Sequence, residues 1–310
     1  GGAGYIGSHI VLELCEQGYD VTVFDNLSTG YKKNIDLRAK FIQGDILNQN
    51  DLSNIFQKDY IAVFHFAALK AAGESMLEPG KYAQANITGT INILNQMVDN
   101  KVQNFIFSST AAVYGMPQYL PLDENHPLKP INFYGFTKHE IERILQWYSE
   151  LKGICFGALR YFNAAGYDIQ GRIQGLEKNP ANLLPIVMET VSEKRDSMDV
   201  YGNDFNTPDG SGIRDYIHVS DLATAHVKAL SVIIEKKKNL ILNLATGNGC
   251  SVLEIIQETQ ELTGKKVIGV NEVNKSIIGG IVIKFPDQVL DMSVKGELFN
   301  MRESFSKSNN

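Results

Sequence analysis

The chain opens with the stretch Gly1-Gly2-Ala3-Gly4-Tyr5-Ile6-Gly7, which leads directly into an apolar run that begins near Ser8. Its glycines form a G-x-x-G-x-x-G series, a pattern typical of a phosphate-binding turn at the start of a helix. Gly1 would permit a tight turn, Gly4 would let the backbone approach a pyrophosphate, and Gly7 would let helix and strand pack closely. The pyrophosphate would lie on the free N–H groups and positive dipole end of the helix. An ordinary glycine-rich loop is the alternative, and the segments after residue 7 are needed to decide between the two.

Two strand-like segments, each leading to an acidic residue, come after the glycine turn. The first, Val21-Thr22-Val23-Phe24-Asp25, ends 18 residues after Gly7, and a second at residues 41–43 is followed by Asp45. The spacing between Gly7 and Asp25 suits a carboxylate that binds the ribose of an adenosine. An acid at Asp25 would also repel a 2′-phosphate, which favours NAD over NADP. The alternative for Asp25 is an ordinary turn acid after a strand.

Alternating strand-like and helix-like segments predict an α/β fold with a doubly wound parallel sheet of the Rossmann type. Strands are predicted at residues 20–25, 40–43, 60–66, 104–109, 154–160 and 240–244. Helices are predicted at residues 8–17, 49–58, 81–100, 134–151, 182–194, 219–234 and 252–263. We also expect a hydrophobic strand ahead of Gly1, central in such a sheet, and a further helix beyond Asn310.

The regular alternation loosens after residue 162, where glycine and asparagine become frequent. We therefore predict two domains. A Rossmann domain that binds NAD would span residues 1–162, and a smaller, mixed α/β lobe would span residues 163–310. In open α/β sheets, ligands bind beyond the carboxyl ends of the strands, so that edge is where site residues are expected.

The composition of the chain limits the kinds of molecule that it could bind. The chain has 310 residues, 44% hydrophobic and 21% charged, with a net charge of −6. This balance argues against nucleic acid or an anionic membrane as a bulk partner. Cys15, Cys155 and Cys250 are far apart and odd in number, which predicts reduced, mostly buried thiols, no metal site and a cytoplasmic location. We see no apolar run of membrane-spanning length.

The segment Tyr134-Gly135-Phe136-Thr137-Lys138 carries the strongest catalytic signal. Residues four apart lie on one face of a helix, so the Lys138 ammonium could lower the pKa of the Tyr134 phenol from about 10. The phenol could then transfer protons near neutral pH. Upstream, Thr110 follows a predicted strand and is our candidate for a second catalytic hydroxyl, whereas Ser108 is better explained as strand-end capping. A Tyr–Lys pair alone is usually a surface pair; the glycine turn upstream argues against that interpretation here.

A longer set of motifs resembles the extended short-chain dehydrogenase/reductase family, and within it the UDP-glucose 4-epimerases. The motifs are GGAGYIGSH (1–9), DNLSTG (25–30), HFAALKAAGES (65–75), FIFSSTAAVYG (105–115), YGFTK (134–138), LRYFNAAG (159–166), NLLPIV (182–187), VYGNDFNTPDGSGIRDYIHVSDLA (200–223) and NLATGNG (243–249).

The resemblance implies NAD-dependent epimerisation at carbon 4 of a UDP-hexose, between UDP-glucose and UDP-galactose, by way of a 4-keto sugar. Tyr134, Lys138 and Thr110 would be catalytic. Cofactor contacts are implied for Gly1, Gly4, Tyr5, Ile6, Gly7, Asp25, Asn26, Asp45, Ile46, Phe66, Ala67, Lys70, Asn86, Ser108, Tyr134, Lys138, Tyr161 and Phe162. Substrate contacts are implied for Lys70, Thr110, Tyr134, Asn163, Asn182, Leu183, Tyr201, Arg214, Lys284 and Asp287. The lobe at residues 163–310 would bind the UDP-sugar, and helices 81–100 and 134–151 would form a homodimer.

The physical chemistry of these positions leaves alternatives open. Arg214 suits a bidentate diphosphate clamp, but it could instead form a salt bridge with Asp209 or Asp215. Asn163 and Asn182 could be turn or cap residues. The related 4,6-dehydratases carry two acidic residues directly after the catalytic threonine, where this chain has Ala111-Ala112, which argues against water elimination.

The resemblance weakens after residue 264, where the family places an Arg and a Gly-Asp pair. Lys284 and Asp287 are the only partial stand-ins, and lysine lacks the planar fork of arginine. Three hypotheses therefore stand: the UDP-glucose epimerase, an epimerase for UDP-N-acetylglucosamine or UDP-glucuronate, and a catalytically inactive NAD-binding protein.

Overall fold

The structure is a computed structural model that describes residues 1–173, 175, 177–178, 182–200, 202, 204–265, 267, 269–271, 280–284 and 289–293, with the backbone alone from residue 269 on. Its contacts divide the chain into two compact units. The first comprises residues 1–181 and 214–249, and the second comprises residues 182–213 and 250–310.

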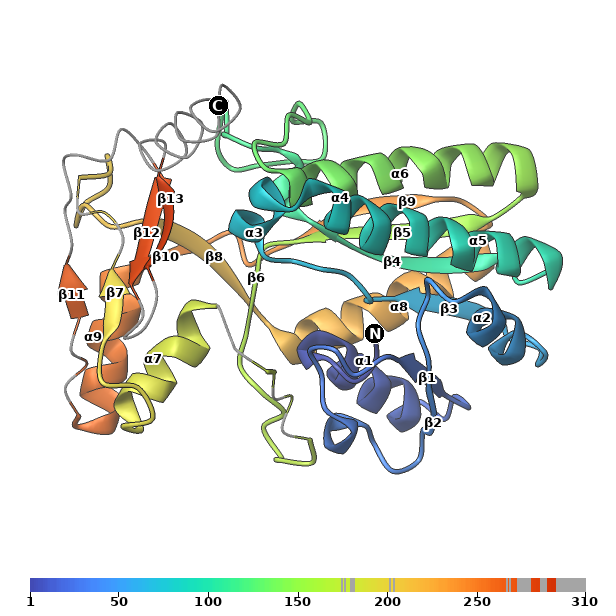
Figure 1. Cartoon of the computed structure of the whole chain (residues 1–310), viewed down its shortest axis with the longest axis horizontal. Coiled ribbons are helices and arrows are strands. Elements are labelled where there is room, and N and C mark those ends of the chain that lie inside the picture. Colours follow the sequence, from blue (N-terminus) through green and yellow to red (C-terminus); the bar gives the residue numbers. More distant parts are fainter. Residues whose placement is uncertain are drawn as a thin grey trace, which may run out of the picture. The chain divides into compact units, whose positions relative to one another are not determined.

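A parallel sheet of four strands lies at the centre of the first unit (Figure 1). In spatial order its strands are β3 (Ala62–His65), β4 (Asn104–Thr110), β5 (Cys155–Tyr161) and β9 (Leu240–Leu244). The register places Thr110 beside Tyr161 at the carboxyl end of the sheet. The two middle strands are almost wholly buried, which explains their near-continuous hydrophobic runs.

Helices cover both faces of this sheet (Figure 1). One face carries α2 (Gln49–Ile55), α5 (Gly89–Asp99) and α6 (Phe133–Lys152), and the other carries α1 (Tyr5–Glu16) and α8 (Val219–Lys236). Helix α6 is capped at both ends by residue types that commonly cap helices. The Asn132 side chain accepts the N–H of Gly135 at the start of α6, and Gly153 ends that helix in the left-handed conformation.

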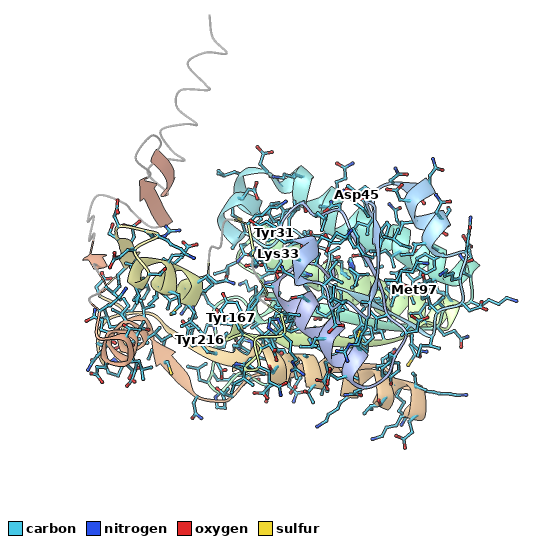
Figure 2. The ribbon with its side chains drawn as sticks, turned by 90° about the horizontal axis from the view of Figure 1, so that it is seen from below. Tyr31, Lys33, Asp45, Met97, Tyr167 and Tyr216 are labelled. Atoms are coloured by element: carbon cyan, nitrogen blue, oxygen red, sulfur yellow. The ribbon has the colours of Figure 1, made fainter. Side chains whose placement is uncertain are left out.

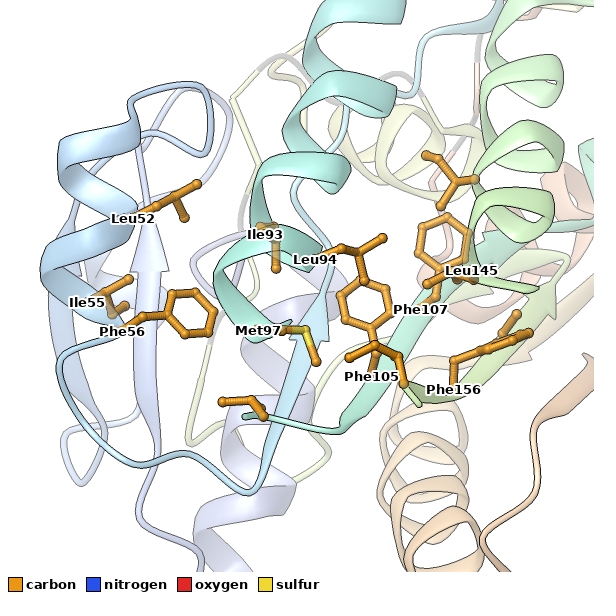
Figure 3. Close-up of a cluster of buried hydrophobic side chains, with 14 residues drawn as sticks. Leu52, Ile55, Phe56, Ile93, Leu94, Met97, Phe105, Phe107, Leu145 and Phe156 are labelled. Carbon is orange, nitrogen blue, oxygen red and sulfur yellow. The ribbon is translucent and has the colours of Figure 1, made fainter. Parts of the chain in front are cut away.

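The largest core lies between the sheet and the helices α2, α5 and α6 (Figure 3). Phe105 and Phe107 alternate along β4 toward this side, whereas Ile106 points to the α8 side. The alternation is the two-residue period of a strand, so a single strand supplies both cores. Fully burying one such side chain contributes roughly 1.5–3 kcal/mol.

Shorter elements complete the first unit. β1 (Thr22–Asp25) pairs in parallel with β2 (Lys40–Gln43), and β6 (Asn163–Ala165) pairs in parallel with β8 (Ile213–His218). The remaining short helices are η1 (Lys32–Asn34), α3 (Ala72–Leu77), α4 (Pro79–Tyr82), the π-helical η2 (Ala83–Thr88) and η3 (Ala111–Val113).

The second unit has its own small core, formed by α7 (Leu183–Val191), α9 (Val252–Thr263) and β7 (Met198–Val200). β7 pairs in parallel with β11 (Gly269–Asn271), and β12 (Gly280–Lys284) pairs antiparallel with β13 (Val289–Ser293). The short strand β10 (Gly249–Ser251) spans the point in the sequence where one unit ends and the other begins. Ser251 and Glu254 form a capping box at the start of α9.

All six predicted strands and all seven predicted helices are present, with shifted ends. α1 begins at Tyr5 rather than residue 8, because Gly4 is its cap and the glycine turn itself is helical after that point. The predicted helix at 81–100 is interrupted by the π-helical segment η2. Helix α3 and the short strands β6, β7, β8, β10, β11, β12 and β13 were not predicted from the sequence.

The contact-based division differs from the predicted boundary at residue 162. The chain returns to the first unit at residue 214, because α8 packs on α1 and β9 joins the central sheet beside β5. The binding roles assigned to the two parts remain predictions. The thiols are also less buried than expected: Cys15 is buried, Cys155 is partly buried and Cys250 is exposed. Among the described residues, no helix combines the length and apolar character that crossing a bilayer requires.

Candidate active site

The glycine turn lies at the carboxyl end of the sheet. The backbone nitrogen of Gly1 donates to the carbonyl of Phe24 at 2.7 Å, in β1. A Cβ on Gly1 would lie 2.3 Å from the nitrogen of Ala67, directly after β3, and a Cβ on Gly7 would lie 2.2 Å from the Gly1 carbonyl oxygen. At Gly4 the nearest atom to such a Cβ is 3.7 Å away. Packing within the chain therefore requires glycine at the outer two positions, whereas the space at Gly4 is open to a ligand.

The start of α1 offers a place for an anion. Gly4 is its cap residue, and no side chain caps the helix. Backbone N–H groups and the helix dipole together favour negative charge at such an end. Tyr5 donates its hydroxyl to the carbonyl of Gly166 at 2.5 Å and is buried, while Ile6 beside it is partly exposed. The Tyr5 side chain thus ties the turn to the segment after β6.

Asp25 holds this turn together from the end of β1. Its carboxylate accepts the N–H of Ala3 at 3.0 Å and the N–H of Leu27 at 2.8 Å. Asn26 donates to Asp45 at 3.0 Å, which joins the ends of β1 and β2. Each Asp25 oxygen retains acceptor capacity beyond these two bonds. The structure therefore gives Asp25 a structural task in addition to the predicted ribose contact.

The loop after β1 is held from two sides. Lys178 donates its backbone N–H to Thr29 at 2.9 Å, and its Nζ lies 5.5 Å from the centroid of the Tyr31 ring. Lys33 Nζ lies 5.3 Å from the same ring, and Figure 2 labels both Tyr31 and Lys33. Lys178 thus packs against the segment that carries the predicted adenosine contacts.

The segment after β3 is fixed by Asn86. This fully buried side chain accepts the N–H of Leu69 at 2.8 Å and donates to the Leu69 carbonyl and to Thr137 Oγ1, each at 3.0 Å. Asn86 therefore positions the Phe66–Lys70 segment against α6. The Ile46 side chain packs against Gly89, the first residue of α5, and fills the space that a Cβ at this glycine would need.

Lys70 Nζ donates to Glu177 Oε1 at 2.5 Å. Glu177 was not among the predicted site residues, and the sequence carries no helical or strand period there that could have identified it. For Lys70 to reach a cofactor or substrate oxygen, this ion pair has to open or share the ammonium. Because Lys70 is half-exposed, the pair is stabilised only weakly.

Three predicted catalytic residues gather at the carboxyl end of β4. Thr110 ends the strand, and Tyr134 and Lys138 come from the first turns of α6. The Thr110 hydroxyl accepts the N–H of Ala112 at 3.2 Å and lies beside the Tyr134 phenol. Lys138 is 2% exposed and donates to the carbonyl of Ser108 at 2.9 Å. Its Nζ lies 4.8 Å from the centroid of the Phe107 ring and 6.0 Å from that of Tyr134.

Burial dominates the electrostatics of this pair. It raises the pKa of Tyr134 above the ordinary value for a phenol, although the neighbouring Thr110 hydroxyl acts in the opposite direction. Burial also lowers the pKa of Lys138 to about 7, against the attraction of Glu142. The sequence predicts that Lys138 lowers the pKa of Tyr134. The direction of the Tyr134 pKa shift in the chain alone is the opposite, because burial of the phenol disfavours its charged form.

Ser108 and Tyr161 form the neighbouring part of the site. Their hydroxyls lie 2.6 Å apart, and burial raises the pKa of Tyr161 to about 12. Phe162 follows and donates its N–H to Leu244 at 3.4 Å. The sequence favours a capping role for Ser108, whereas in the structure its side chain contacts the phenol of another predicted site residue.

Residues predicted to bind the substrate are spread over both units. In the first unit, Asn163 donates to the carbonyl of Asp215 at 3.0 Å, and Arg214 is an exposed residue of β8. In the second unit, Asn182 is the exposed cap residue of α7 and Leu183 is its first residue. Lys284 lies in β12, where the backbone alone is described. Tyr201 and Asp287 lie outside the described residues.

The site also contains residues that were not predicted from the sequence. Ser75 Oγ accepts the N–H of Tyr134 at 3.0 Å, so α3 contacts the start of α6 directly. Glu142 and Arg160 form a buried ion pair behind Ser109. Helical spacing could have revealed Glu142, since it lies four residues after Lys138. Among the described residues, no group of His, Cys, Asp or Glu side chains is placed to hold a metal ion.

Comparison with known proteins extends the picture beyond single residues. A family model described as "NAD dependent epimerase/dehydratase family" matches residues 1–245. A second model, "ATP synthase delta (OSCP) subunit", matches residues 251–305. The curated UDP-glucose 4-epimerase of Lactobacillus helveticus is 43% identical over 265 residues, which cover 85% of this chain and 80% of the relative.

Solved structures agree with these matches. The UDP-glucose 4-epimerase of Brucella ovis, in complex with NAD, aligns with a TM-score of 0.85 and 42% identity, covering 89% of this chain and 85% of that one. The enzyme of Bifidobacterium longum, in complex with NAD+ and UDP, aligns with a TM-score of 0.81 and 35% identity, covering 87% and 84%.

The glycine turn, the Tyr134–Lys138 pair beside Thr110 and the central parallel sheet all lie within the 245 residues that the epimerase model matches. They are found in the same part of the chain that the relatives share. The chain therefore belongs to the NAD dependent epimerase/dehydratase family.

Proposed function

We propose that this protein interconverts UDP-glucose and UDP-galactose by NAD-dependent epimerisation at carbon 4 of the sugar. The observation that carries the proposal is the convergence of Thr110, Tyr134 and Lys138 at the carboxyl end of β4. The adjacent strand β3 ends at the segment against which the glycine turn packs. A proton-transfer group and a pyrophosphate-binding turn at one edge of a sheet are the two parts that such a reaction requires.

The residues of the turn fit NAD. The space at Gly4 is open, the start of α1 favours an anion, and the carboxylate of Asp25 disfavours a 2′-phosphate. When bound, NAD would accept hydride from carbon 4 of the sugar and return it to the opposite face. The other proposed cofactor residues follow the edge of the sheet, from Asn26, Asp45 and Ile46 through Phe66, Ala67, Lys70 and Asn86 to Ser108, Tyr161 and Phe162.

The chain's own residues move the proton. Tyr134 would take the proton of the 4-hydroxyl, and the Thr110 hydroxyl beside the phenol would hold that hydroxyl in line. Lys138 would hold a ribose hydroxyl while its bond to Ser108 fixes its position. Ala111 and Ala112 offer no carboxylate for elimination of water, so reduction of the 4-keto sugar is the remaining outcome.

The UDP-sugar would be held by Asn163, Asn182, Leu183, Tyr201 and Arg214, with Arg214 binding the diphosphate as a planar fork. Lys284 and Asp287 are proposed from their positions in the sequence alone. They lie in the stretch that the second family model matches, which is also where the epimerase pattern weakens.

Incubation with UDP-galactose tests the proposal. The purified protein should form UDP-glucose without added cofactor, and nucleotide-sugar chromatography would measure it. Turnover of UDP-N-acetylglucosamine or UDP-glucuronate in place of UDP-galactose would identify that UDP-sugar as the substrate. Retention of NAD without turnover of any UDP-sugar would contradict the proposal and favour an inactive NAD-binding protein.

Two glycines of the turn should respond differently to alanine. Gly4→Ala should weaken NAD binding, by roughly tenfold or more, while the melting temperature of the apo protein changes little, because the added Cβ meets only the ligand's space. Gly7→Ala should lower the apo melting temperature, because its Cβ would meet the Gly1 carbonyl. Isothermal titration with NAD and thermal unfolding of each apo variant measure the two effects. Equal loss of stability in both variants would contradict this assignment.

We also propose a cytoplasmic homodimer formed through α5 and α6. Trp147 and Leu151 are 60% and 69% exposed on one face of α6, and Phe136 lies three turns earlier on the same face. A stripe of exposed apolar side chains on a long helix suits contact with a second copy. The double variant Trp147→Glu, Leu151→Glu should convert the dimer to a monomer in light scattering. A wild-type protein that is already monomeric would refute the interface.

A further inference from the structure

A buried ion pair lies behind the catalytic residues. Arg160 on β5 donates its Nε to Glu142 Oε1 at 3.0 Å and one terminal nitrogen to Glu142 Oε2 at 2.6 Å. Both side chains are at most 4% exposed. This is a bidentate pair in the interior, where bringing two charges out of water costs several kcal/mol per ion before their attraction offsets it. Replacing a buried ion pair with well-packed apolar residues is often neutral or stabilising, so stability alone is a weak explanation for this pair.

The remaining bonds of the pair lead to the catalytic end of the sheet. Ser109 on β4, directly before Thr110, donates its hydroxyl to Glu142 Oε1 at 2.6 Å. Arg160 donates to the Tyr114 hydroxyl at 2.9 Å, and Tyr114 donates to Asn243 at 2.7 Å. The network thus joins α6, β4, β5 and β9, the elements among which the catalytic hydroxyl and the Tyr134–Lys138 pair are held.

Glu142 also lies one helical turn after Lys138 and two turns after Tyr134, on the same face of α6. The groups that face Lys138 from its neighbours are Tyr134 and Glu142 on α6, His65 on β3, and the Ser108 carbonyl with the Phe107 ring on β4. Burial keeps His65 neutral, because it lowers the pKa of that imidazole far below its ordinary value. Glu142 is the carboxylate among these groups.

We propose that Glu142 is a positioning residue for the epimerase reaction: with Arg160 as its anchor, it fixes Ser109 and the adjacent turn of α6, and its negative charge favours the ammonium form of Lys138. Arg160 acts through Glu142, because its guanidinium holds both carboxylate oxygens in a bidentate pair. The inference rests on the proposed function for its catalytic meaning, but the charge of Lys138 can be measured without turnover.

The experiment compares Glu142→Gln, the double variant Glu142→Gln, Arg160→Met, and the wild type, each saturated with NAD. The double variant removes both charges and so avoids leaving an unpaired buried guanidinium, which could by itself unfold the protein. Glu16→Gln is the matched control, since it breaks a Glu–Arg pair with Arg38 at the exposed end of α1.

The first readout is the titration of Lys138 by NMR of lysine labelled with carbon-13 at Cε, with the signal assigned through Lys138→Met. Without the Glu142 charge the ammonium is less favoured, so the midpoint should fall by about one pH unit in both Glu142 variants. The control should titrate as the wild type does. An unchanged midpoint in the folded double variant would overturn the proposal.

The second readout is the pH profile of kcat/KM for UDP-galactose. The alkaline limb, where Lys138 loses its proton, should move to lower pH in the double variant by the same amount as the NMR midpoint. Glu142→Asp keeps the carboxylate, so its alkaline limb should lie between those of the wild type and Glu142→Gln. A purely structural role predicts that the double variant, once folded, has the wild-type profile. If the wild type itself shows no conversion, the proposed function fails, while the NMR titration still decides the role of Glu142.

Discussion

Tyr134→Phe should lower kcat for UDP-galactose by roughly 10²–10⁴-fold and leave NAD bound. The expected loss is the usual contribution of a positioned general base, because phenylalanine retains the ring but has no group that accepts the sugar proton. Thr110 cannot replace the phenol, since an alkanol is a much weaker acid than a phenol. The side chain is partly buried beside Lys138, so the ring of the variant should keep its packing.

Single-turnover measurement separates this effect from folding. The variant should show no reduced nicotinamide on mixing with UDP-galactose, although bound NAD is still detected after acid release. Tyr60→Phe is the matched control: the Tyr60 hydroxyl is buried with no hydrogen-bond partner in the described structure, and it lies before β3, at the end of the sheet away from the site. Removing it should keep full activity and preserve or raise stability. Wild-type turnover in Tyr134→Phe would overturn the assigned base.

Lys138→Met should have two opposite effects, a loss of activity and a gain of stability at neutral pH. The wild-type ammonium is buried, and burial lowers its pKa to about 7 from 10.5. In the unfolded chain this lysine keeps the higher value, so between pH 7 and 10.5 the unfolded state binds more protons. Stability of the wild type should therefore rise with pH across that window, and below pH 7 the full cost of burying the charge remains. Methionine removes the cost, which we expect to gain roughly 1–3 kcal/mol at pH 7.

The measurement is urea unfolding of both proteins without NAD, at several pH values from 6 to 10. The advantage of Lys138→Met should be greatest at or below pH 7 and should shrink as pH rises toward 10. kcat should fall by about 10²-fold or more, since nothing then holds the ribose hydroxyl or the charge beside Tyr134. Lys152→Met, at the exposed end of the same helix, should change stability by only a few tenths of a kcal/mol. A variant that is less stable than the wild type at every pH would contradict this account.

Patterns that act over a few residues allowed much of the fold to be predicted. The glycine series at Gly1, Gly4 and Gly7 placed a turn before α1, and hydrophobic periods located the strands of the central sheet. The short strands β6 and β8 escaped prediction, because a three- to six-residue segment carries too little period to distinguish it from a loop. The return of residues 214–249 to the first unit is a long-range pairing, which local patterns do not encode.

For the site, local motifs alone identified which chemical groups are available: a glycine turn with Gly4 at its centre, and a phenol, an amine and a hydroxyl at Tyr134, Lys138 and Thr110. The environment of these groups depends on the three-dimensional fold. Burial depends on all the surrounding elements together, and it lowers the pKa of Lys138 to about 7. It also raises the pKa of Tyr134, whereas the helical spacing of these two residues predicts that this pKa is lowered. Glu142 meets Arg160, and Lys70 meets Glu177, only because distant segments fold together, so these charges belong to the fold and not to any stretch of sequence.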